Sequence, residues 1–122
     1  MPRQVLPEDR IHPVIRDRVA QAHLSTLAEV QQAMAQHAVV VVGMAGNPFV
    51  RKARKLLDTA GVSHHYLGYG SYLSEWRRRN AIKMWTGWPT LPMVFVKGVL
   101  VGGADDLAAL VRSGGLASLL KA

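Results

Sequence analysis

Residues 88–103 read WPTLPMVFVKGVLVGG, and this stretch decides the fold. Two runs of largely β-branched residues, 93–96 and 99–101, are separated only by Lys97 and Gly98. A two-residue turn that ends in glycine between two such runs is typical of a tight antiparallel hairpin. The stretch therefore predicts two adjacent strands of a sheet.

The residues before this hairpin predict a β-α-β unit followed by a helix. The apolar run over 38–42 is typical of a strand that is buried on both faces. Asn47 followed by Pro48 is a favourable start for a helix, and Gly61 is placed to end it in the left-handed region. The elements expected here are strands over 38–42 and 62–67 and helices over 48–60 and 74–85.

Further helices are expected at both ends of the chain, over 13–22, 26–37 and 105–111, with a last helical turn that ends at Leu120. Thr26 followed three residues later by Glu29 is typical of a capping box, which would begin the second of these helices. The whole order predicts an α/β fold with a four-stranded mixed sheet and helices on both faces.

Length and composition indicate one globular domain without membrane spans. The chain has 122 residues, of which 49% are hydrophobic and 19% charged. Its longest apolar run is far shorter than the ~20 residues that a membrane helix requires. Residues 1–9 carry two prolines and an acidic pair where a secretory leader would be apolar, so we expect a cytoplasmic protein. The net charge of +7 is compatible with an anionic partner.

Three motifs resemble the glutaredoxin form of the thioredoxin fold. Residues 88–92 resemble the family segment W-P-T-x-P, and residues 102–106 resemble G-G-C-D-D with Ala104 in place of cysteine. Residues 39–57 resemble the first strand, loop and helix of the family. The pattern is closest to that of the monothiol glutaredoxins. The resemblance implies an N-terminal arm and helix over 1–25, added to a glutaredoxin-like domain over 26–122.

The departure from the family lies at its active site. Glutaredoxins carry C-P-Y-C or C-G-F-S where this chain has Asn47-Pro48-Phe49-Val50, and Met44 stands where a lysine is usual. The chain contains no cysteine at all. Thiol–disulfide exchange and iron–sulfur ligation both require a thiolate, so we expect no catalytic residue and no redox activity.

The resemblance also implies where glutathione would bind, without any covalently bound cofactor. In the family, the residue before a cis-proline pairs its backbone with the cysteinyl unit, a role that maps onto Leu91 and Pro92, beside Thr90. The γ-glutamyl carboxylate is received at a helix N-terminus, which maps onto Gly103, Ala104 and Asp105. The arginine that holds the glycyl carboxylate in many monothiol members is best matched by Arg79.

These observations leave several functions open. The first is a redox-inactive protein that binds glutathione, a glutathionylated peptide or a protein partner in the former active-site groove. The second is a transferase-like enzyme that uses the thiol of bound glutathione, with the helix start at Asn47 and a hydroxyl of Tyr69 or Tyr72 stabilising the thiolate. A nucleic-acid-binding module is a third possibility, which rests only on the net charge and the arginine run over 77–79. A homodimer is a further hypothesis. No metal site is expected, since the adjacent His64 and His65 would point to opposite faces of a strand.

Overall fold

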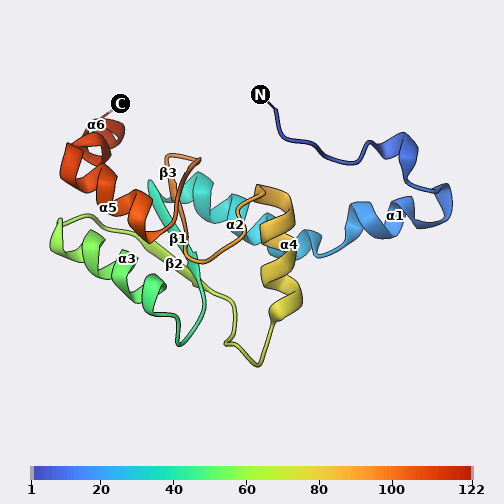
Figure 1. Cartoon of the computed structure of the whole chain (residues 1–122), viewed down its shortest axis with the longest axis horizontal. Helices are drawn as coiled ribbons and strands as arrows, with labels where there is room; N and C mark the ends of the chain where they lie inside the picture. Colours follow the sequence, from blue (N-terminus) through green and yellow to red (C-terminus); the bar gives the residue numbers. More distant parts are fainter. Residues whose placement is uncertain (1, 122) are drawn as a thin grey trace.

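The computed structural model describes residues 2–121 (Figure 1). Met1, the first residue of the expected N-terminal arm, and Ala122, the last residue of the expected glutaredoxin-like domain, lie outside the described residues. The elements are η1 (Glu8–Arg10), α1 (Pro13–Gln21), α2 (Leu24–Gln36), β1 (Val39–Gly43), α3 (Pro48–Thr59), β2 (His65–Gly68), α4 (Trp76–Thr86), β3 (Met93–Val96), β4 (Val99–Gly102), α5 (Ala104–Ser113) and α6 (Gly115–Lys121).

The four strands form one mixed sheet in the order β2-β1-β3-β4. Strand β1 pairs parallel to β2, with Val41 opposite Tyr66, and antiparallel to β3, with Val41 opposite Val94. Strands β3 and β4 form the expected hairpin. Both residues of its turn, Lys97 and Gly98, have positive φ, as a type I′ turn requires. The predicted thioredoxin-like sheet is confirmed.

Alternate residues of β1 build two cores, one on each face of the sheet. Val40 and Val42 belong to the core that α2 and α4 cover, and Val39 and Val41 belong to the core that α3, α5 and α6 cover (Figure 1). All four valines are at most 1% exposed. The strand is therefore buried on both faces, as its unbroken apolar run predicted.

Strand β2 is shorter than expected because the residues before it complete the end of α3. Gly61 has a φ of +71°, which confirms its role in ending the helix. The Val62 amide then donates to the Leu57 carbonyl at 2.9 Å. This hydrogen bond turns the chain back over α3, so β2 begins only at His65.

The predicted capping box at Thr26 and Glu29 is wrong. Helix α2 begins earlier, after His23, whose backbone is left-handed with a φ of 55°. Thr26 is 2% exposed, and its Oγ1 accepts a hydrogen bond from Nε of Arg78 at 2.9 Å. The Glu29 carboxylate accepts a hydrogen bond from the Tyr69 hydroxyl at 2.6 Å. Both side chains therefore join α2 to the α4 side of the molecule.

Arg78 completes this junction between α2 and α4. Its guanidinium lies over the ring of Tyr69, 4.7 Å from the ring centroid, and pairs with Glu29 at 3.6 Å and with Glu75 at 3.1 Å. Burial, followed by the hydrogen bond to Glu29, raises the pKa of Tyr69 well above its usual range. The raised pKa favours the protonated hydroxyl, which is the form that donates to Glu29 of α2.

The N-terminal arm and α1 extend away from the sheet (Figure 1). Helix α1 buries none of its side chains. The arm contacts α4 through Arg3, whose guanidinium donates to the carbonyls of Trp85 and Thr86. Between residues 2 and 121, no helix has the length and apolar character needed to cross a bilayer.

Candidate ligand-binding groove

Helix α3 begins at the tetrad Asn47-Pro48-Phe49-Val50, which the resemblance aligns with the family's active site, and the side chain of Asn47 caps it. Its Oδ1 accepts hydrogen bonds from the amides of Phe49, at 2.9 Å, and Val50, at 3.2 Å, while Pro48 occupies the first turn. The predicted helix start is confirmed. The amides that would face a thiolate in a cysteine-bearing relative are therefore satisfied by an uncharged carbonyl oxygen.

The other tetrad residues divide between solvent and core. Phe49 is 56% exposed, whereas Val50 is 3% exposed. A Cβ on Gly43 would lie only 2.6 Å from Cγ1 of Val50, so the strand and the helix are in close contact at this point. Met44 is 6% exposed and belongs to the α2/α4 core. An apolar core side chain thus occupies the place of the usual lysine.

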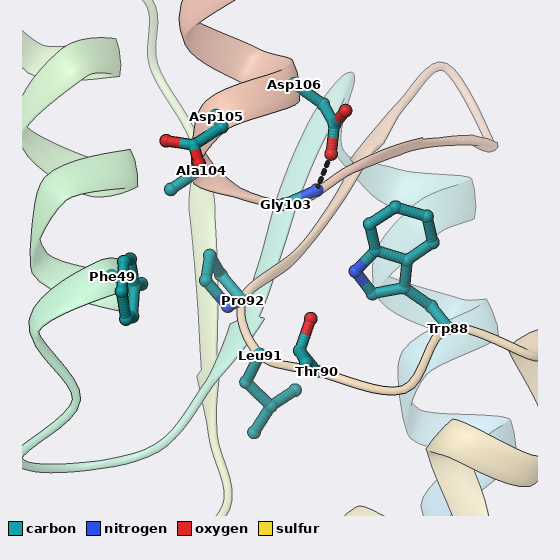
Figure 2. A pocket seen from close by; sticks show the side chains of 9 residues that line it. All are labelled: Phe49, Trp88, Thr90, Leu91, Pro92, Gly103, Ala104, Asp105 and Asp106. Atoms are coloured by element: carbon teal, nitrogen blue, oxygen red, sulfur yellow. Dashed lines mark hydrogen bonds between the residues drawn. The ribbon is translucent and has the colours of Figure 1, made fainter.

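The segment before β3 and the start of α5 enclose a hollow of about 300 Å³, which we call the α5 hollow (Figure 2). The peptide bond between Leu91 and Pro92 is cis, in agreement with the expectation from the family. The hollow is lined by Phe49, Trp88, Thr90, Leu91, Pro92, Gly103, Ala104, Asp105 and Asp106. The structure thus brings six of the seven expected glutathione-site residues together.

The N-terminal turn of α5 presents free amides at this hollow. The Gly103 amide donates to the Asp106 carboxylate at 2.9 Å, and the Gly103 carbonyl accepts from the Leu107 amide at 3.0 Å (Figure 2). Within residues 2–121 the amides of Ala104 and Asp105 have no hydrogen-bond partner. Free amides in the first turn of a helix, together with the helix dipole, favour an anionic group.

Trp88 contributes a second donor without a partner. Its indole Nε1 is buried and has no hydrogen-bond partner among the described residues. In Figure 2 the nitrogen side of the ring faces the interior of the hollow, beside Gly103 and Thr90. Buried donors are rarely left unpaired, because desolvation without a partner costs about 1–3 kcal/mol. The arrangement therefore suits a ligand that carries a hydrogen-bond acceptor.

Phe49 also lines a second hollow of about 360 Å³, which we call the tetrad hollow. It is lined by Met44, Asn47, Pro48, Phe49, Tyr72, Lys83, Pro89, Thr90 and Leu91. Phe49, Thr90 and Leu91 line both hollows, so the two form one continuous groove. Tyr72, whose hydroxyl was one of two expected at the site, lies in this groove.

Lys83 is the one cation among the described residues that line the two hollows, and the motif-based reasoning missed it. It follows Arg79 by four residues, so the two side chains stem from the same side of α4. That spacing is the signal that would have identified Lys83. The groove therefore retains a cation. This cation comes from α4, and not from the position of Met44, where a lysine is usual.

Arg79 and Tyr69 lie outside the groove. Arg79 is 7% exposed, and its Nη1 donates to the carbonyl of Tyr69 at 2.8 Å and to the carbonyl of Ser74. The guanidinium thereby holds the loop that precedes α4. The Tyr69 hydroxyl is engaged by Glu29. Neither residue is among those that line the two hollows.

An ion pair joins α3 and α5 beside the α5 hollow. Lys52 Nζ lies 3.0 Å from Asp105 Oδ1, and the two side chains are 50% and 84% exposed. Pairs this exposed contribute only about 0–1 kcal/mol, so a charged ligand can replace either partner at small cost. Within residues 2–121, no group of three or more His, Asp or Glu side chains is arranged to hold a metal ion.

Sequence comparison finds similar proteins in several organisms. The chain is 48% identical over 99 residues to a glutaredoxin-like protein of Dictyostelium discoideum. The aligned part covers 81% of this chain and 80% of that protein. It is 32% identical over 94 residues to glutaredoxin-C6 of Oryza sativa, and the aligned part covers 77% of this chain and 84% of that protein. Mitochondrial monothiol glutaredoxin-5 of Schizosaccharomyces pombe is 35% identical over 88 residues, and the aligned part covers 67% of this chain and 60% of that protein. No protein-family model matches the sequence.

Solved structures give the same result for the fold. A mutated buckwheat glutaredoxin superimposes with a TM-score of 0.71 at 26% identity, over 80% of this chain and 88% of that one. A buckwheat glutaredoxin–glutathione complex superimposes with a TM-score of 0.68, at the same identity and coverage.

Proposed function

Because this chain belongs to the glutaredoxin family and contains no cysteine, we propose that it binds glutathione in the former active-site groove and does not exchange disulfides. The observation that carries the proposal is the unpartnered Trp88 Nε1 in the α5 hollow, beside the free amides of α5. Both the indole nitrogen and the amides are donors that a ligand with acceptor groups would satisfy.

The absence of exchange follows from the chemistry of the tetrad. Disulfide exchange begins with a thiolate that attacks a disulfide sulfur. Asn47 and Val50 provide no such nucleophile, and the chain has no other cysteine that could act from a distance. Glutathione that enters the groove therefore leaves it chemically unchanged.

The polar groups of the groove match the charges of glutathione in order. Its γ-glutamyl carboxylate fits the free amides of Ala104 and Asp105 at the start of α5. Its cysteinyl backbone fits the backbone of Leu91, beside the cis peptide bond to Pro92. Its glycyl carboxylate fits Lys83, which replaces both the lost lysine and the inward-turned Arg79. The buckwheat glutaredoxin, which forms a complex with glutathione, supports glutathione as the ligand.

A second candidate is transferase-like chemistry on the thiol of bound glutathione. The observation in its favour is Tyr72, which is 65% exposed and lines the tetrad hollow with Asn47. Turnover of a chlorinated aromatic acceptor that is lost in Tyr72→Phe would support it. Equal turnover in Tyr72→Phe would remove the hydroxyl from the mechanism.

Calorimetric titration with reduced glutathione tests the proposed function. We expect saturable binding in the millimolar range or tighter. Lys83→Gln is expected to weaken it by about tenfold, because one charge-assisted contact is lost. Lys55→Gln removes an exposed cation of α3 that lines neither hollow, so it should bind like the unaltered chain. Absence of binding to the unaltered chain at millimolar glutathione contradicts the proposal.

A further inference from the structure

The groove continues beyond the tetrad onto the outward face of α4. A third hollow of about 400 Å³, the α4 hollow, is lined by His23, Trp76, Arg77, Asn80, Lys83 and Met84. Lys83 lines both this hollow and the tetrad hollow, so the two are contiguous. The three hollows therefore form one surface that runs from the start of α5, past the tetrad, and along α4.

This surface is too long for a tripeptide. Trp76 lies seven residues before Lys83 on α4, which at 1.5 Å per residue is about 10 Å. An extended chain spans about 3.3–3.6 Å per residue, so about three residues would lie along α4 in addition to a ligand that fills the first two hollows. The extent of the surface thus points to a polypeptide.

Large apolar side chains are exposed along the added part. Trp76 is 54% exposed and Met84 74% exposed, and they flank the α4 hollow. Tyr72 and Leu73, in the loop before α4, are 65% and 96% exposed. Single exposed apolar residues need no explanation, but two that line one hollow, with two more in the loop before the same helix, are typical of an interaction site.

The charge of the α4 hollow selects the partner. Arg77 and Lys83 line it together with His23, and no acidic residue lines either it or the tetrad hollow. Among the described residues no carboxylate pairs with Arg77 or Lys83, and the Arg77 guanidinium lies over the Trp76 ring, 5.2 Å from its centroid. A cationic rim around apolar side chains complements a segment with acidic and apolar residues.

We propose that the α4 hollow is a docking site for an extended acidic and apolar segment of a partner protein, continuous with the glutathione groove. This proposal rests on the proposed function, because it takes the α5 and tetrad hollows to be filled by glutathione. Trp76 and Met84 contact the apolar side chains of the segment, and Arg77 contacts its carboxylates. The α4 hollow thus supplies the selectivity among partners that the groove alone does not provide.

Two fluorescent peptides with one glutathionylated cysteine test this proposal by anisotropy. One continues after the cysteine with Asp-Leu-Glu-Phe and the other with Lys-Leu-Lys-Phe. We expect the acidic peptide to bind at least about tenfold more tightly than the basic peptide and than free glutathione. Arg77→Gln should remove most of the difference between the two peptides, because it removes the contact to the carboxylates. Trp76→Ala should remove most of the gain of the acidic peptide over free glutathione, because it removes an apolar contact. Neither variant should change the affinity for free glutathione.

Matched controls separate the two proposals. Val99→Ala shortens an apolar side chain that is 60% exposed on β4, away from the groove, and should bind both peptides like the unaltered chain. Equal affinity for the two peptides, with glutathione still bound, overturns the docking site and leaves the proposed function intact. If the chain does not bind glutathione, the proposed function is overturned instead, whether or not a peptide binds. Trp76 and Arg77 are exposed, so melting temperatures equal to that of the unaltered chain are expected and check the fold.

Discussion

Asn47→Cys is expected to turn this chain into a catalyst of thiol–disulfide exchange. The new sulfur would stand at the start of α3, where the amides of Phe49 and Val50 now donate to the Asn47 side chain at 2.9 and 3.2 Å. The same amides and the helix dipole would then favour a thiolate, which lowers the pKa of a cysteine at such a position. The groove beside it would bring the glutathione moiety of a mixed disulfide to this sulfur.

The gain is measured as reduction of the mixed disulfide between glutathione and hydroxyethanethiol, with glutathione as the reductant. The unaltered chain should not exceed the blank, so the expected change is from no activity to a measurable rate. The alkylation rate of the new thiol against pH should show a midpoint below the usual value of about 8.5. Loss of the asparagine cap should lower stability by about 1 kcal/mol, which leaves the fold intact.

Val50→Cys is the matched control for this gain. It introduces the same thiol three residues further along α3, where the native side chain is only 3% exposed and faces β1. Buried thiols are unreactive, so this variant should remain at the blank. Equal rates for the two variants would contradict the claim that the groove still binds the glutathione moiety. An Asn47→Cys chain that is folded and can be alkylated but has no activity would contradict it as well.

Arg79→Met is expected to lower the free energy of unfolding by about 2 kcal/mol or more. Its guanidinium is buried and donates to the carbonyls of Tyr69 and Ser74. Removing the donor leaves the buried carbonyl of Tyr69 without a partner, at about 1–3 kcal/mol, and also removes the part-buried hydrogen bond to Ser74. Urea denaturation followed by circular dichroism measures the loss.

Arg77→Met provides the comparison on the same helix. Arg77 is exposed and contacts only the Trp76 ring among the interactions of the described residues, so its replacement should change stability by less than about 0.5 kcal/mol. The opposite pattern, with Arg79→Met as stable as the unaltered chain but unable to bind glutathione, would restore Arg79 as a ligand and remove its structural role.

The elements that the sequence predicted well are those whose signals are local. The Lys97-Gly98 turn, the apolar run of β1 and the Asn47-Pro48 helix start each depend on a few neighbouring residues, and the structure contains all three. The W-P-T-x-P and G-G segments also came together at one hollow, because the hairpin between them fixes their separation.

The residues that were misjudged are those whose partners lie far along the chain. Thr26 and Glu29 have the spacing of a capping box, but their partners Arg78 and Tyr69 are 52 and 40 residues away. Arg79 and Lys83 have the same charge and stem from one side of α4, yet the loop before α4 engages Arg79 and leaves Lys83 in the groove. Spacing alone cannot tell which of two cations a loop will cover.

The indole N–H resonance of Trp88, followed in ¹⁵N-labelled protein during titration with reduced glutathione, shows directly whether glutathione occupies the groove. Trp88→Phe assigns the resonance, and the indoles of Trp76 and Trp85, which do not line the α5 or tetrad hollow, serve as internal references. We predict a saturable shift of the Trp88 resonance as its nitrogen gains an acceptor, with the references nearly unmoved. A Trp88 resonance that stays fixed at millimolar glutathione in the folded protein would contradict the account.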